Sequence, residues 1–399
     1  MRAYVCRLAA TAAFMLVVNA AAAQDDKIRI GLIYTLSGAP STLGQQSKNG
    51  FELALKNLGG KMGGKDVELV VADDELKPDV AIQKVRGLLE RDRVDFVVGP
   101  IFSNILVAIH KPVIDAGKIL ISTNAGTSNF AGAGCNANFF VTSYQNDQIF
   151  EAVGQASNKL GYKRVYVLVP NYPAGKDAIA GFKRTYKGEI IEESLLPLNT
   201  TDFGPEVSKI SAAKPDALFT FMPGGLGINL LNTYIQAGLK GKIPIVSTFT
   251  ADEATLPVLK DNAVDVYGVL TWAPNMDNPA NKKFVSEYES AYNAVPASYA
   301  MQTRESESTS NKTFLPRARN HSATLVAAMP TCSSLTSTCV LASTFGSARI
   351  RNSTMRLLSS SSRPSTAGSG RTPTSSTATP RLSSLSARKR PGAEPASGR

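Results

Sequence analysis

The feature that most constrains the fold of this chain is an alternation of short apolar runs and longer amphipathic runs that begins at Lys27. The apolar runs are hydrophobic at consecutive positions, so both faces of each strand are expected to be buried. The intervening runs carry apolar residues at helical spacing. Strands separated by helices in this way form a parallel sheet covered on both sides. The pattern predicts an α/β protein whose first strands are "IRIGLIYTL", "DVELVVAD", "VDFVVGP" and "KILIST".

The same layout occurs twice, which predicts two lobes. A second series of helices and strands runs from "NDQIFEAVGQASNKLG" to "IPIVST". We place the first part of lobe 1 at residues 24–143 and lobe 2 at residues 144–248. The chain is then expected to return to lobe 1 over residues 249–303, through "VYGVLTW" and the helix "NPANKKFVSEYESAYNAV".

Residues 1–23 have the layout of a secretory signal peptide. Arg2 and Arg7 precede a short apolar run, and the small residues Ala21 to Ala23 follow it. The apolar run is shorter than the roughly 20 residues of a membrane-spanning helix. A retained N-terminal anchor is the alternative. We expect the signal to be cleaved and the mature chain, which has no other candidate membrane span, to be exported.

The net charge of +11 comes from the last quarter of the chain. Residues 304–399 contain 14 Lys and Arg against three Glu and no Asp, so the rest of the chain is balanced. The body of the protein therefore lacks the electrostatic footprint of a nucleic-acid-binding protein.

Residues 304–399 also differ in composition, with 22 Ser in 96 positions and no persistent apolar period. Such a stretch cannot bury enough apolar surface to offset its chain entropy. A disordered natural tail is one interpretation. A reading-frame change after Thr303 is the interpretation we favour, and a basic module with its own purpose is the third.

Few residues of the body suggest catalysis or metal binding. His110 lies mid-helix among apolar residues and is interpreted as packed or surface-lying rather than as a base. The acidic run Asp73-Asp74-Glu75 lacks the spacing of a calcium loop and is interpreted as a solvated loop. Cys135 has no obvious partner and is interpreted as a structural free thiol. Trp272 lies at the end of a predicted strand. We expect it either to line the cleft between the lobes or to pack in the core, and the sequence does not favour one role over the other.

The chain has no G-x-S-x-G elbow, no G-x-G-x-x-G fingerprint after a strand and no Cys/His zinc spacing. We therefore expect no enzymatic activity, no cofactor and no metal. A Rossmann-like enzyme is a further hypothesis, which needs a nucleotide fingerprint or a catalytic His or Cys, and the sequence shows neither.

Four strand ends carry small polar residues, and ligands of open parallel sheets bind beyond the carboxyl ends of strands. Ser103 follows "VVGP", where free N–H groups at a helix start attract carboxylates. A ligand carboxylate is expected between the Ser103 hydroxyl, the following amides, and the Thr127 hydroxyl with the backbone of Ala125 or Gly126. The alternative is that Ser103 only caps its own helix. The remaining two strand ends are followed by Ser37–Gly44 and by Pro223-Gly224-Gly225. In the second of these segments, Gly224 is a candidate ligand contact.

Several segments together resemble the periplasmic substrate-binding proteins of ABC importers, of the branched-chain amino acid (Leu/Ile/Val-binding) class. They run from about residue 26 to Thr303 and include "KIRIGLIYTLSG", "GQQSKNGFELAL", "VVGPIFSN", "ISTNAG", "FFVTSYQNDQ" and "PNYPAGKDAIAGFKR". The resemblance implies a type I periplasmic-binding fold, with two lobes, three hinge crossings and a ligand cleft. It also implies a periplasmic location.

The resemblance assigns roles to several residues. Ser103 matches the serine that holds the ligand carboxylate, while Ala125, Gly126 and Thr127 fall on the second carboxylate-holding loop. Tyr172 lies near the position of an aromatic residue from the second lobe.

One region departs from the amino-acid binders, which use a glutamate to pair with the ligand ammonium. Here the matching stretch is Thr248-Phe249-Thr250-Ala251-Asp252, with Thr250 and Asp252 as the candidate contacts. Either Asp252 takes the place of the glutamate or the ammonium site is absent. This leaves an amino acid, an aromatic acid or an amide as ligand.

The function that follows is a carrier that captures a small carboxylate between its lobes and delivers it to an ABC permease and ATPase complex, working as a monomer. A ligand-sensing regulatory receptor on the same fold is the alternative. If the protein carries the 304–399 tail, we expect it to fold poorly, because it lacks the family's last elements.

Overall fold

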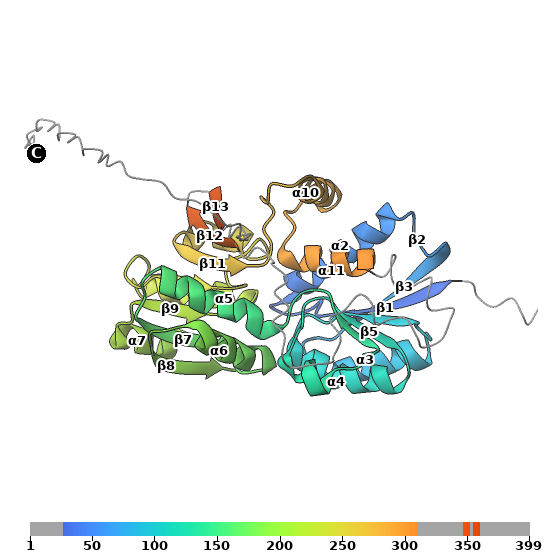
Figure 1. Cartoon of the computed structure of the whole chain (residues 1–399), viewed down its shortest axis with the longest axis horizontal. Helices are drawn as coiled ribbons and strands as arrows, with labels where there is room; N and C mark the ends of the chain where they lie inside the picture. Colours follow the sequence, from blue (N-terminus) through green and yellow to red (C-terminus); the bar gives the residue numbers. More distant parts are fainter. Residues whose placement is uncertain (1–26, 310–345, 352–353, 360–399) are drawn as a thin grey trace, which may run out of the picture. The chain divides into compact units, whose positions relative to one another are not determined.

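The computed structural model describes residues 27–309, 346–351 and 354–359, which form two β-sheets with helices on both faces (Figure 1). The first sheet has the strand order β2-β3-β1-β4-β5-β6, and its pairs are parallel except for β2 with β3. Its strands are β1 (Ile28–Tyr34), β2 (Lys61–Met62), β3 (Lys65–Asp73), β4 (Phe96–Val98), β5 (Ile119–Ser122) and β6 (Phe139–Val141).

Helices cover both faces of the first sheet. Helices α3 and α4 pack together on one face, and α2 and α11 lie side by side on the other (Figure 1). The apolar residues of α3 recur at helical spacing, and Ala81, Val85 and Leu88 are its buried residues. The elements are α2 (Ser41–Asn57), α3 (Pro78–Glu90), α4 (Ser103–Asp115), η1 (Ser128–Phe130), η2 (Gly132–Gly134), α10 (Pro279–Tyr292) and α11 (Ser298–Thr309).

The second sheet has the order β13-β12-β11-β10-β9-β7-β8, parallel from β8 to β11. Alternate residues of β7 enter different cores: Val165 and Val167 lie in one cluster, and Tyr166 and Leu168 in another. This strand is therefore buried on both faces, as its continuous apolar run predicts. The strands are β7 (Arg164–Pro170), β8 (Glu189–Leu196), β9 (Ala217–Thr220), β10 (Ile245–Ser247), β11 (Val266–Leu270), β12 (Gly346–Arg351) and β13 (Thr354–Ser359).

The helices of the second sheet divide between its faces. Phe182 of α6 and Ile149 of α5 join the core that contains Val165, while Val207 of α7 and Leu230 of α8 join the core that contains Tyr166. The elements are α5 (Asn146–Lys159), α6 (Pro173–Thr185), α7 (Gly204–Ala213), α8 (Gly225–Gln236), α9 (Leu256–Leu259) and η3 (Lys260–Ala263). The predicted α/β class with two mostly parallel sheets is confirmed.

The return to the first sheet occurs later than predicted. The strand within "VYGVLTW" is β11, which pairs in parallel with β10 and belongs to the second sheet. The boundary after residue 248 is therefore too early, because an apolar strand pattern does not reveal which sheet a strand joins. The chain rejoins the elements of the first sheet with α10 and α11, both of which contact α2.

Two strands lie within the range predicted to be a disordered or frame-shifted tail. β12 pairs antiparallel with β11, and β13 pairs antiparallel with β12. The other residues after 309 and the predicted signal peptide lie outside the described residues. The interpretation of this range stays a prediction.

Three side-chain predictions need correction or completion. Cys135 is disulfide-bonded, so the predicted free thiol is wrong; spacing along the chain does not show which distant cysteines meet. Asp74 is not solvated but fully buried, and accepts hydrogen bonds from Thr35 Oγ1 at 2.6 Å and from the Leu76 amide at 2.8 Å. Burial raises the pKa of Asp74 to about 6. Trp272 is a core residue and donates to Asn281 Oδ1 at 2.6 Å.

His110 packs within the protein. Its ring stacks on Phe130 with 3.9 Å between centroids and meets Phe139 edge-on at 5.0 Å. Burial lowers the pKa of His110, which favours the neutral ring in this apolar setting.

Candidate functional site

A small cavity of about 20 Å³ lies where strand ends and helix starts of both sheets meet. This volume holds about one water molecule. A ligand with a six-membered ring therefore needs the surrounding side chains to part. The lining residues are Ile101, Phe102, Ser103, Asn124, Ala125, Tyr144, Asn146, Phe150, Tyr172, Ala174, Phe221, Pro223, Phe249 and Tyr299.

The polar side of the cavity begins at the start of α4. Ser103 is 1% exposed and is the first residue of this helix, whose N-terminal cap is Phe102 and which has no side-chain cap hydrogen bond. The Ser103 hydroxyl instead accepts a hydrogen bond from Asn146 Nδ2 at 3.1 Å. The alternative that Ser103 only caps its helix is therefore wrong. The first amides of α4, like those of any helix, lack intrahelical acceptors and attract an anion.

The loop after β5 supplies part of the same side. Ala125 lines the cavity, and its amide donates a long hydrogen bond of 3.4 Å to the Pro100 carbonyl. The Gly126 amide donates to Asn146 Oδ1 at 3.1 Å, and a Cβ at this glycine would lie 1.9 Å from the Tyr144 carbonyl oxygen. Only glycine fits at this position, and its contribution is to hold Asn146 rather than to line the cavity.

The remaining candidate residues lie outside the cavity lining. Thr127 donates its hydroxyl hydrogen to Asn129 Oδ1 at 2.8 Å, so this hydroxyl is engaged locally. Thr250 is fully buried, accepts from the Met222 amide at 2.9 Å and holds the chain after β9 against the chain after β10. The structure thus brings Ser103, Ala125 and Tyr172 to the cavity, and leaves Gly126, Thr127, Gly224, Thr250 and Asp252 behind or beside it.

Gly224 and Gly225 form a close contact between elements of the two sheets. A Cβ on Gly224 would lie 3.4 Å from Leu43 Cδ1, and a Cβ on Gly225 would lie 2.9 Å from Ala39 Cβ. Gly225 therefore permits the start of α8 to approach the loop before α2, whereas at Gly224 the φ of +61° favours glycine. A second hollow of about 80 Å³ lies beside this contact and shares Phe102 and Pro223 with the first cavity.

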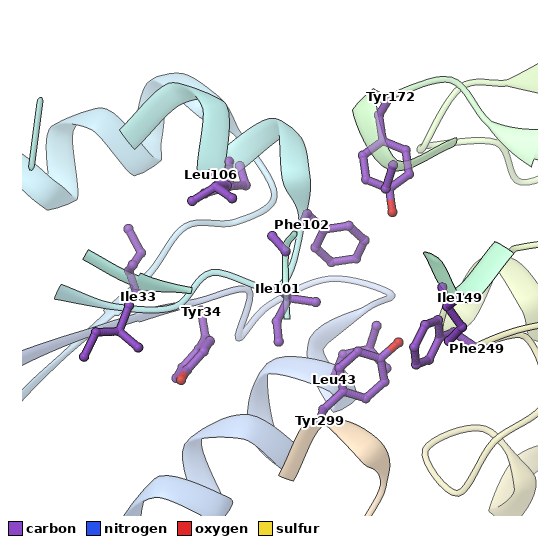
Figure 2. Packing of buried hydrophobic residues seen from close by; sticks show 14 of the residues in the cluster. Ile33, Tyr34, Leu43, Ile101, Phe102, Leu106, Ile149, Tyr172, Phe249 and Tyr299 are labelled. Carbon is purple, nitrogen blue, oxygen red and sulfur yellow. The ribbon is translucent and has the colours of Figure 1, made fainter. Parts of the chain in front are cut away.

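Aromatic rings make up the other side of the cavity. Tyr172 packs against Phe102 with 6.1 Å between centroids, and against Phe221 at 6.2 Å. Phe249 contacts Phe221 at 6.3 Å and Tyr299 at 5.6 Å. Figure 2 shows Phe102, Tyr172, Phe249 and Tyr299 gathered around the same space. Burial raises the pKa of Tyr172 well above its usual value, so its hydroxyl stays protonated.

Phe249 has an unusual backbone conformation. Its φ is +56°, in the left-handed region that residues other than glycine and asparagine rarely adopt. The Phe249 side chain is 3% exposed. Residues held in this way cost on the order of 1–3 kcal/mol and concentrate at functional sites.

An acidic pair lies next to the aromatic side. Asp252 is fully buried and Glu253 is 6% exposed, and one oxygen of each has no hydrogen-bond partner among the described residues. Burial raises the pKa of Asp252 to about 6. Burial, and then the charge of Asp252, raises the pKa of Glu253 to about 8. Neither side chain is among the residues that line the cavity, although burial, and then the charge of Asp252, raises the pKa values of the lining residues Tyr144 and Tyr299.

Sequence reasoning missed the residue that organises the polar side. Asn146 is 4% exposed, lines the cavity and contacts both Ser103 and Gly126. The motif "SYQNDQ" contains it, but the pattern indicated only a helix start. Phe102, Tyr144, Phe249 and Tyr299 were also missed, since an aromatic residue in a strand or helix pattern does not distinguish a core position from a cavity wall.

The lining carries no Asp, Glu, Lys, Arg or His side chain. Within the described part of the chain, no group of three or more His, Cys, Asp or Glu side chains is placed to hold a metal ion. The same part holds no helix of the length and hydrophobicity needed to cross a bilayer.

The family model described as "Periplasmic binding protein" matches residues 27–311. The chain belongs to this family. The match ends close to Thr303, where the sequence changes character. The resemblance to the Leu/Ile/Val-binding class is confirmed by a curated relative, Leu/Ile/Val-binding protein homolog 6 of Brucella melitensis. It is 28% identical over 294 residues, which cover 71% of this chain and 74% of the relative.

Solved structures of the family are also similar to this chain. A solute-binding protein of an ABC transporter from R. palustris, in complex with benzoate, has a TM-score of 0.75 and 25% identity, covering 84% of this chain and 96% of that one. A second, from Rhodopseudomonas palustris BisB5 in complex with 3,4-dihydroxy benzoic acid, has a TM-score of 0.69 and 28% identity. The matched region covers 73% of this chain and 81% of the BisB5 protein chain.

Proposed function

We propose that this protein is the solute-binding component of an ABC transporter and that it captures an aromatic carboxylate in the periplasm. The observation that carries the proposal is the division of the cavity: hydrogen-bond donors lie on one side and aromatic rings on the other, with no charged side chain in the lining. The ligand is released unaltered to the permease, and no catalytic step is involved.

The uncharged lining discriminates between ligand classes. A carboxylate finds the Ser103 hydroxyl and the N-terminal amides of α4, which compensate its charge. The ammonium of an amino acid would meet only neutral side chains, and burying an unpaired charge is costly. An aromatic acid without an amino group therefore fits better than leucine or phenylalanine.

Two similar structures support the ligand class, since those solute-binding proteins were solved in complex with benzoate and with 3,4-dihydroxy benzoic acid. The aromatic rings of the cavity wall supply both apolar area and ring-to-ring contact for such a ligand. We further propose that the signal peptide over residues 1–23 is cleaved, and that the exported chain works as a monomer.

The test is isothermal titration of the full chain with benzoate, leucine, phenylalanine and benzamide. Benzoate is expected to bind at least tenfold more tightly than the other three, because it alone combines a ring with a single negative charge. Thermal shifts with the same compounds should follow mass action. Tighter binding of leucine than of benzoate would overturn the proposed ligand class. Turnover of any bound compound would overturn the carrier role.

A further inference from the structure

A buried hydrogen-bond network behind the polar side of the cavity joins residues of both sheets. Asp177, on α6 of the second sheet, is 7% exposed. Its Oδ2 accepts from Asn146 Nδ2 at 3.0 Å, and its Oδ1 accepts from the hydroxyl of Ser128, on η1 after β5, at 2.6 Å. The Ser128 amide also donates to Asp177 Oδ2, at 3.3 Å.

The network permits only one orientation of the Asn146 amide. Its oxygen accepts from the Gly126 amide, and its nitrogen donates to Asp177 and to Ser103. Rotating the amide by half a turn would place its oxygen against the Asp177 carboxylate and its NH2 group against the Gly126 N–H. Both contacts would be repulsive, so Asp177 and Gly126 together fix which atoms face Ser103.

The orientation of Asn146 determines what Ser103 offers to a ligand. A serine hydroxyl has one hydrogen to donate and accepts through its lone pairs. Asn146 Nδ2 donates a hydrogen bond to the Ser103 hydroxyl oxygen, so the hydroxyl hydrogen must point away from Asn146. Because Ser103 lines the cavity, this hydrogen can be donated to a ligand there. Ser103 is thereby held as a donor, which suits a carboxylate, a group that only accepts.

We propose that Asn146 and Asp177 are positioning residues that set the selectivity of the cavity for carboxylates, by holding the Ser103 hydroxyl as a donor toward the ligand. The inference rests on the proposed function for its ligand class. It adds that the selectivity depends on a residue of the second sheet that does not line the cavity. Ser128 completes the arrangement by holding Asp177 from the first sheet.

Two variants of Asp177 separate positioning from electrostatics. Asp177→Ala removes both the negative charge and the acceptor for Asn146, whereas Asp177→Asn removes the charge but keeps an oxygen that accepts from Asn146. By charge alone, both variants should bind an anion more tightly than the parent. By positioning, Asp177→Ala weakens benzoate binding about tenfold, the usual effect of losing one hydrogen bond to a charged group, and Asp177→Asn retains it.

The readout is the ratio of benzoate affinity to benzamide affinity, measured by titration of the full chain. Asp177→Ala is expected to lower this ratio about tenfold, because a freely rotating Ser103 hydroxyl serves the amide NH2 group as well as the carboxylate. Ser128→Ala, at a half-buried position, is expected to lower it two- to threefold. Asp216→Ala is the matched control, since the Asp216 carboxylate accepts from backbone amides of Lys163 and Arg164 and does not line the cavity.

An unchanged or raised ratio in Asp177→Ala would overturn the inference, as would an equal loss in Asp177→Ala and Asp177→Asn. If Asp177→Ala does not fold, Ser128→Ala decides, and an unchanged ratio there overturns the inference. A parent protein that binds leucine but not benzoate overturns the proposed ligand class alone, and leucine with leucinamide then replaces the probe pair. Binding of neither carboxylate by a folded parent chain overturns both.

Discussion

The polar side and the aromatic side of the cavity are held in place by different interactions, and this difference indicates that the two sides contribute differently to ligand binding. On the polar side, Ser103 and Asn146 are held by hydrogen bonds, which are directional and tolerate little change in orientation. On the aromatic side, Tyr172, Phe221 and Phe249 are held by ring packing, which tolerates small shifts. The polar side therefore determines which head group binds, and the aromatic side determines how much apolar surface is buried.

The largest effect is expected from breaking the aromatic side. Phe221→Ala removes a ring that is 5% exposed and contacts Phe150, Tyr172 and Phe249. We expect a loss of about 3–5 kcal/mol in the free energy of unfolding, because a buried ring leaves a cavity. Chemical denaturation measures this, with Val258→Ala, at a 61% exposed position, as the control that should change little. A loss below 1 kcal/mol would show that the ring is not part of the core.

A pH effect of the order of a few kcal/mol is expected from the acidic pair beside the aromatic side. Burial raises the pKa of Glu253 to about 8, so the folded state favours the protonated form. The contribution of Glu253 to the free energy of unfolding is fully present below pH 4.5, its pKa in the unfolded chain. This contribution is lost as the pH rises through about 8, its pKa in the folded protein. The melting temperature should therefore fall between pH 5 and pH 9, and Glu253→Gln should flatten that decline. A decline of equal slope in Glu253→Gln would contradict the assignment.

The polar side is tested by Ser103→Ala. Loss of one hydrogen bond to a charged group corresponds to about 1.5–3 kcal/mol, which is roughly a 10- to 150-fold rise in the dissociation constant for benzoate. Stability should also fall, by about 1–3 kcal/mol, because the buried Asn146 Nδ2 loses its acceptor on Ser103. Ser290→Ala, which removes a hydroxyl from the exposed face of α10, serves as the control for titration calorimetry. Unchanged affinity for benzoate in Ser103→Ala would place the carboxylate elsewhere.

The smallest effect is expected at the start of α8, where elements of the two sheets approach each other beside the cavity. A methyl group on Gly225 would lie 2.9 Å from Ala39 Cβ, so Gly225→Ala should weaken binding of every ligand severalfold without changing their order. Adding Ala39→Gly should restore part of the affinity, because it removes the opposing methyl group but leaves the Ala39 carbonyl oxygen, which would lie 3.0 Å from the new Cβ. Gly87→Ala, where the nearest heavy atom lies 3.8 Å away, is the control. A change in ligand order, or no rescue by the double variant, would contradict this account.

The sequence predicted the elements of the fold and about half of the polar side. Apolar runs buried on both faces gave the parallel strands, and the rule that ligands bind at strand ends led to Ser103 and Ala125. The pattern did not reveal that Asn146 and Asp177 meet, because they lie 31 positions apart on two helices. It also assigned β11 to the wrong sheet, since strand partners are chosen by packing rather than by local composition.

The aromatic side was the harder half to predict. Only Tyr172 was found, and the resemblance to a family supplied it rather than the residue pattern. Phe249 and Tyr299 lie in segments where the sequence alone is equally consistent with ordinary core packing. Their role depends on backbone conformation and on contacts between distant segments, which no spacing rule encodes.

The left-handed backbone at Phe249 has a consequence for engineering this protein. Glycine or asparagine at this position would relieve about 1–3 kcal/mol of main-chain strain but would remove a buried ring whose packing is worth about 3–5 kcal/mol. Selection for heat resistance is therefore expected to keep the phenylalanine. Stability and ligand capture favour the same side chain here, because the ring that fills the core also lines the cavity.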